Sequence, residues 1–145
     1  MNLFRRAALV GAASGLRMMI GTAGLISART PGLPAPLQKP VARLVAGAAI
    51  AFELVADKSK WIPSRLEPSS ISGRIALASV AGAVLARGAK RPLLPAILVA
   101  AVACVAAAKI GHDVRAVLAE RFNDRRVAAA EDALAIRLVT AAAEI

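Results

Sequence analysis

Long apolar stretches alternate with short polar connections along this chain. Five stretches have the length and composition of helices, and Pro, Gly or charged residues separate them. The first contains about 21 residues, which at a rise of ~1.5 Å per residue is enough to cross a hydrocarbon layer of ~30 Å. We predict helices over residues 7–27, 41–58, 72–87, 92–111 with an extension towards Glu120, and 125–143, with a Pro-rich loop over 30–40.

These elements predict an all-α fold, a polytopic membrane bundle of four to five helices in a single domain, residues 1–145. The second and third helices are short for a full span, so we expect them to tilt, to lie deep in the bundle or to be partly re-entrant.

Small residues recur at four-residue spacing in four of the helices. Such seams let helix backbones approach closely, which replaces the hydrophobic drive that is absent in lipid. The pattern indicates close helix packing, and a seam left unused inside the bundle would support a homo-oligomer. The pairs are Gly11 and Gly15, Gly47 and Ala51, Ala78 and Gly82, and Ala103 and Ala107.

Composition supports the membrane interpretation. Hydrophobic residues make up 58% of the chain and mean hydropathy is +0.63, which is too apolar for an ordinary soluble domain of 145 residues. The net charge of +10 comes from basic residues between the apolar stretches, where they would face anionic membrane lipids. Aromatic residues are 3% and Tyr is absent, so there is no stacking platform for bases, and nucleic acid is not an expected partner.

The side of the N-terminus is only weakly encoded. If each predicted helix crosses the membrane, ten Lys and Arg residues lie on the side of the N-terminus and six on the other side. This bias favours a cytoplasmic N-terminus.

Charged residues inside apolar stretches are the main candidates for function. Arg17 lies in the first helix, Glu53 and Asp57 in the second, and Glu131 and Asp132 in the last. Each costs ~2.5–3.5 kcal/mol at the centre of a bilayer, so it must be paired or hydrated.

The spacing of these residues limits how they can pair. Glu53 and Asp57 share one helix face, whereas Glu131 and Asp132 point about 100° apart on an α-helix. Arg17 and Arg74 are their natural partners. The resulting network could bind a small anion or relay a proton, or it could only fix the register of the helices.

A weak internal repeat is also suggested. Ser14-Gly15 and Gly24 in the first helix are echoed by Ser72-Gly73 and Gly82 in the third, and an acidic helix follows each time. A duplicated half of a transporter would have this pattern.

Three segments carry a more specific pattern: GAASGLR at 11–17, FELVADKSKWIPSRLEPSSISGR at 52–74 and AEDALAI at 130–136. Together they resemble an uncharacterised bacterial integral-membrane family, domain of unknown function family 4126. The resemblance spans most of the chain and implies a small helical protein of the bacterial cytoplasmic (inner) membrane, without implying a reaction. Lys60 departs from the proline expected there, which implies a less rigid backbone after the second helix.

Carried over by position, the resemblance marks Arg17, Glu53, Asp57, Lys58, Pro63, Ser64, Arg65, Pro68, Arg74, Glu131 and Asp132. From these and the bilayer argument we predict a substrate-binding site made of Arg17, Glu53, Asp57, Lys58, Arg65, Arg74, Glu131 and Asp132.

The leading hypothesis is a transporter or channel for a small anion or a proton-coupled solute. The alternatives are a membrane scaffold or accessory subunit with a structural charge network, and a lipid-headgroup-binding protein that uses Lys58, Lys60, Trp61 and Arg65. The sequence contains no Walker loop, no GxGxxG and no nucleophile elbow, and His112 has no second His at ligand spacing. The sequence therefore predicts no metal, no other cofactor and no enzyme activity.

Overall fold

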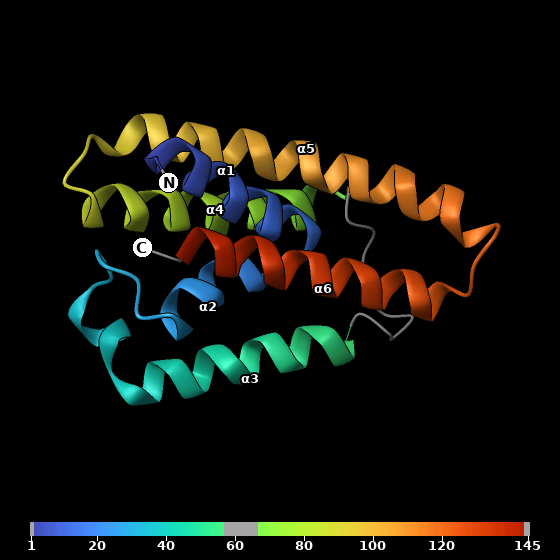
Figure 1. Cartoon of the computed structure of the whole chain (residues 1–145), viewed down its shortest axis with the longest axis horizontal. Coiled ribbons are helices and arrows are strands. Elements are labelled where there is room, and N and C mark those ends of the chain that lie inside the picture. The colour runs from blue at the N-terminus through green and yellow to red at the C-terminus, as the bar shows by residue number, and fades with distance from the viewer. Residues whose placement is uncertain (1, 57–66, 144–145) are drawn as a thin grey trace.

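A computed structural model describes residues 2–56 and 67–143, and this part of the chain contains six α-helices and no strand (Figure 1). The all-α prediction is therefore confirmed for these residues. The helices are α1 (Leu3–Leu16), α2 (Ile20–Ser27), α3 (Pro40–Ala56), α4 (Pro68–Gly88), α5 (Leu93–Ala119) and α6 (Asp124–Ala143), with a 3₁₀ turn, η1 (Ala35–Gln38), before α3.

The predicted first spanning helix, residues 7–27, is wrong. The helix ends at Leu16, and Arg17 adopts an extended backbone with φ −137° and ψ 119°. The chain then turns back (Figure 1), and the start of α2 packs against α1, with Gly21 against Ser14 and the Val10 carbonyl. The first element is thus a helical hairpin whose turn lies at Arg17, where the charged side chain can reach partners on other helices.

The remaining helices follow the prediction closely. Helices α3, α5 and α6 lie within a few residues of their predicted bounds, while α4 begins at Pro68 rather than at residue 72. Proline fits this first position because its missing N–H would have no partner inside the helix. The structure does not support the predicted repeat, because the first element is a hairpin and its supposed equivalent, α4, is one continuous helix.

Small residues form the tightest packing in the bundle. A Cβ atom at Gly11 would overlap the Ala100 carbonyl of α5, and one at Gly15 would overlap the Cys104 carbonyl. At Gly82 of α4, a Cβ atom would lie 2.7 Å from the Ala96 carbonyl oxygen. Two of the predicted small-residue seams therefore hold α1 and α4 against α5.

A different environment surrounds the seam on α3. A Cβ atom at Gly47 would meet no described atom within 4 Å, and the neighbouring Ala51 is exposed. Leu44, Phe52 and Val55 on the same helix are 70–75% exposed. Helix α3 therefore presents an apolar surface to its surroundings, on the side of the molecule opposite to α5 (Figure 1).

Two of the described helices are long and apolar enough to cross a membrane, Pro68–Gly88 and Leu93–Leu118. Only 22% of the most apolar stretch of α5 is buried. A core helix of a soluble protein would be mostly buried, whereas Leu98, Val102 and Ile110 are all more than half exposed.

Both ends of the described chain lie at the same end of the bundle (Figure 1). Ala7 of α1 packs against Ala86 at the end of α4 and Ala96 at the start of α5, and the Arg6 side chain donates to the Ala142 carbonyl of α6 at 2.7 Å. Arg5 and Arg6 consequently lie on the same side as Arg87 and its basic neighbours. The predicted bias of Lys and Arg assumed a continuous first helix, which the hairpin replaces.

Candidate functional site

The turn of the α1–α2 hairpin is the point where charged side chains from three other helices converge. A helix that ends inside a bundle leaves carbonyl groups at its carboxyl end and N–H groups at its amino end without intrahelical partners. Here the carboxyl end of α1 and the amino end of α2 are close together around Arg17. Both sets of backbone groups therefore need partners from elsewhere in the bundle.

Arg74 of α4 binds carbonyl groups at the carboxyl end of α1. Its Nη1 donates to the Gly15 carbonyl at 2.9 Å and to the Ser14 carbonyl at 3.5 Å, and the residue is 7% exposed. A cation at the carboxyl end of a helix also interacts favourably with the helix dipole. Arg74 thus stabilises the end of α1 by both hydrogen bonding and charge.

Glu53 of α3 binds backbone N–H groups at the amino end of α2. Its Oε2 accepts a hydrogen bond from the Met19 backbone N–H at 2.8 Å, and the Met18 backbone N–H also interacts with the carboxylate. The positive charges of Arg74 and Arg17 act on the same carboxylate. The Glu53 carboxylate therefore occupies the amino end of α2, a position where helices commonly bind free anions.

Arg17 forms an ion pair with Asp132 of α6, from its Nη2 to Oδ1. Its side chain is 2% exposed and that of Asp132 is 19% exposed. An unpaired arginine at this depth would cost several kcal/mol, so this partner is essential to the folded arrangement. We call Arg17, Glu53, Arg74 and Asp132 the hairpin cluster, whose two positive and two negative charges balance.

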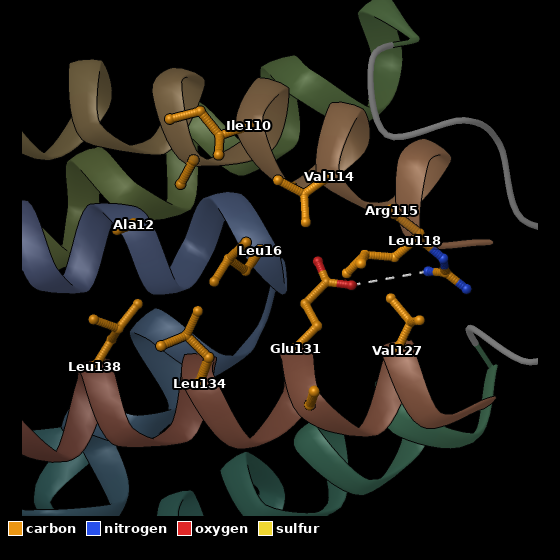
Figure 2. A pocket seen from close by; sticks show the side chains of 13 residues that line it. Ala12, Leu16, Ile110, Val114, Arg115, Leu118, Val127, Glu131, Leu134 and Leu138 are labelled. Carbon is orange, nitrogen blue, oxygen red and sulfur yellow. Dashed lines mark ion pairs between the residues drawn. The ribbon is translucent and has the colours of Figure 1, made fainter. Parts of the chain in front are cut away.

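Glu131 contacts a different partner. Its Oε2 lies 3.9 Å from Nη1 of Arg115 on α5 (Figure 2). Glu131 and Asp132 therefore face different helices, as their predicted angular separation requires. Of the eight predicted site residues, the structure brings four into the hairpin cluster and places Glu131 beside it. Asp57, Lys58 and Arg65 lie outside the described residues.

Sequence reasoning missed two parts of this arrangement. Arg115 carries no signal in the sequence beyond its positive charge, because its pairing with Glu131 depends on how α5 and α6 cross. The backbone carbonyls of Ser14 and Gly15 and the N–H of Met19 become binding groups only because the helix breaks. The buried Arg17 was the one available signal for this break.

Two cavities among the described residues lie near the hairpin cluster, and its four residues line neither of them. One, of about 400 Å³, lies between α1, α5 and α6 and is lined by Glu131 and Arg115 but by none of the four cluster residues (Figure 2). Another, of about 430 Å³, lies between α2, α3 and α6 and is mostly aliphatic, with the hydroxyl groups of Ser27 and Thr140 in its lining.

Comparisons with protein-family models, with curated proteins and with solved structures found no match to this chain. The residues and their geometry alone therefore carry the functional argument.

Proposed function

We propose that this is a small multi-pass protein of the bacterial cytoplasmic membrane that transports a small anion or a proton-coupled solute through the hairpin cluster. The observation that carries the proposal is the break at Arg17, where two helix ends meet charged residues from three other helices. Broken helices whose ends face charged groups near the middle of a bundle are a recurring way to build ion sites in transporters.

Membrane placement is supported by the exposed apolar surfaces. The outer faces of α3 and α5, on opposite sides of the molecule, carry many large apolar side chains, among them Leu44, Phe52 and Val102. The two carboxylates in the middle of α6 are paired within the bundle, Asp132 with Arg17 and Glu131 with Arg115, whereas the arginines of the same helix are exposed. Exposed apolar side chains and internally paired carboxylates suit a bundle surrounded by lipid.

Glu53 is the residue that would couple anion binding to proton uptake. Its carboxylate occupies a position with backbone N–H donors and two nearby arginines, the groups that would also bind a free anion. Protonation of Glu53 would remove the negative charge that holds it there, and a small anion could then take its place. One proton would be taken up for each anion bound, which couples the two.

Flux through proteoliposomes tests this proposal. We expect wild-type protein to carry chloride or another small anion together with protons, with both fluxes lost in Arg17→Ala. Asp57→Asn should also abolish flux if the predicted site extends to that residue. Glu53→Gln should retain anion flux but lose its coupling to protons, because glutamine cannot gain or lose one. Lys109→Gln is the matched control, since Lys109 forms an exposed pair with Asp113 at 3.2 Å.

A scaffold or accessory subunit is the second candidate, and one observation favours it: each residue of the hairpin cluster has a partner within the protein. On this hypothesis the charges only fix the helices in place. Wild-type protein would then show no flux of chloride, nitrate, phosphate or acetate, and other proteins would copurify with it. Flux in Arg17→Ala equal to that of wild type would also reject the transport proposal.

Self-association and family membership belong to the same proposal. Gly47 and Ala51 form the seam that the bundle leaves open, and we place a homo-oligomer contact there.

The resemblance to domain of unknown function family 4126 stays a proposal that rests on sequence motifs. All four residues of the hairpin cluster, Arg17, Glu53, Arg74 and Asp132, are among the motif residues.

A further inference from the structure

The cavity between α1, α5 and α6 has the properties of a site for a hydrocarbon chain. It has a volume of about 400 Å³, and most of its lining is aliphatic, including Leu16, Ile110, Val114, Leu134 and Leu138 (Figure 2). It exists because α1 ends at Leu16, whereas α5 and α6 continue past that point. The hairpin therefore leaves an apolar space between the two longer helices.

The cavity is elongated and has one polar end. Its lining on α6 runs from Val127 to Leu138, which at a rise of ~1.5 Å per residue is a length of about 16 Å. Arg115 and Glu131 lie towards the Val127 end, and Ala12 and Leu138 lie at the other (Figure 2). A narrow apolar space with a charged end is complementary to an amphiphile rather than to a compact polar solute.

Charge at the polar end favours an anionic headgroup. Glu131 lies 3.9 Å from the Arg115 guanidinium, whose side chain is 24% exposed, and thus holds a cation at the end of the cavity. Arg121, Arg125 and Arg126 are exposed at the nearby turn between α5 and α6. Basic side chains at a membrane surface attract anionic lipids.

The direction of the cavity also matches a lipid in a bilayer. Its polar end lies towards the α5–α6 turn, at the end of the bundle, and its apolar end lies near the middle of α1 (Figure 2). We propose that this cavity binds one acyl chain of an anionic phospholipid, with the phosphate beside Arg115. The inference rests on the membrane placement in the proposed function, but not on transport.

Native mass spectrometry of the purified full-length protein in detergent, with added phosphatidylglycerol or phosphatidylcholine, tests this site. We expect wild-type protein to retain phosphatidylglycerol about fivefold more than phosphatidylcholine, the preference that one basic side chain gives at a membrane surface. Ala130→Phe, which places a ring in the cavity, should reduce retention of both lipids about tenfold, because it fills the space of the chain. Ala106→Phe, on an exposed part of α5 outside the cavity, is the size-matched control.

Arg115→Gln separates the headgroup from the chain. It should remove the preference for phosphatidylglycerol while both lipids still bind, whereas Arg43→Gln, at an exposed arginine on α3 outside the cavity, should leave the preference unchanged. If Ala130→Phe does not fold, the smaller Ala130→Leu is used and the same loss is expected.

Unchanged lipid retention in the cavity variant would overturn the proposal. So would equal retention of the two lipids by wild-type protein, or a change of oligomeric state in Ala130→Phe without a change in lipid retention, which would assign the cavity to a second copy. Resistance of the protein to extraction from membranes by carbonate is measured separately. Release of the wild-type protein by carbonate would reject the membrane placement itself. Absence of flux through wild-type protein that still retains lipid would reject only transport.

Discussion

Arg17 combines deep burial, a broken helix and an ion pair in one residue. Its backbone ends α1, and its side chain reaches Asp132 on α6, which is more than 100 positions away in the chain. Glu53 and Arg74 make the same kind of long-range contact to the backbone on either side of Arg17. At the residue scale, the hairpin turn is therefore stabilised by side chains that the local sequence does not contain.

Removal of one partner from the Arg17–Asp132 pair should destabilise the protein strongly. We expect Arg17→Ala to lower the free energy of unfolding by about 3–5 kcal/mol, because Asp132 would be left partly buried without its cation. The double variant Arg17→Ala/Asp132→Ala should lose less than the sum of the two single changes. Unfolding in mixed micelles, followed by circular dichroism, measures all three values, and strict additivity would show that the pair is not coupled.

Helix packing depends on where a small residue meets a neighbouring backbone. Gly11 and Gly15 let α1 contact α5 through main-chain atoms, and Gly32, with φ +96°, lets its loop approach Gly88 at the end of α4. A side chain at Gly32 would be strained by the backbone conformation as well as by the contact. At the element scale, a glycine matters where a neighbouring backbone lies opposite it, as at Gly11, Gly15 and Gly32, and not where its surface is open, as at Gly47.

The same substitution should therefore have opposite effects on two helices. Gly11→Ala should destabilise the protein by about 1–3 kcal/mol, because the new methyl group overlaps the Ala100 carbonyl. In the monomer, Gly47→Ala should be neutral or stabilising by up to ~1 kcal/mol, since nothing described lies within reach and alanine favours the helix. Parallel unfolding measurements would contradict this packing if both variants lost similar stability.

The hairpin decides the topology of the whole molecule. A spanning first helix would put the N-terminus and the residues after α2 on opposite sides of a membrane, whereas the hairpin returns the chain to the side on which it began (Figure 1). The starts of α1 and α5 and the ends of α4 and α6 then share one side, and the α5–α6 turn lies on the other.

Cysteine labelling in intact cells distinguishes these topologies. In a Cys104→Ala background, Arg5→Cys and Ala28→Cys should react with an impermeant maleimide from the same side, and Phe122→Cys from the opposite side. Cys104 is the free thiol among the described residues and is fully buried, so its removal prevents background reaction. Reaction of positions 5 and 28 from opposite sides would restore the continuous first helix.

The sequence by itself determined most of the helices and the importance of the buried charges. Apolar periodicity and Pro and Gly positions placed α3, α5 and α6 within a few residues, because these signals are local. The cost of a charge in an apolar stretch selected Arg17, Glu53 and Asp132 before any contact was known, and Arg74 followed as a partner for the acidic residues. The angle between neighbouring positions on a helix separated Glu131 from Asp132.

Only the tertiary structure decided the break at Arg17, because no proline lies there and glycines such as those on either side, Gly15 and Gly21, also lie inside other helices of this chain without ending them. The break is favourable only when Arg74 binds the end of α1, Glu53 binds the start of α2 and Asp132 pairs with Arg17. The cavity beside α5 and α6 likewise follows from the shortened α1. Both features depend on contacts between residues far apart in the chain, which a local pattern does not encode.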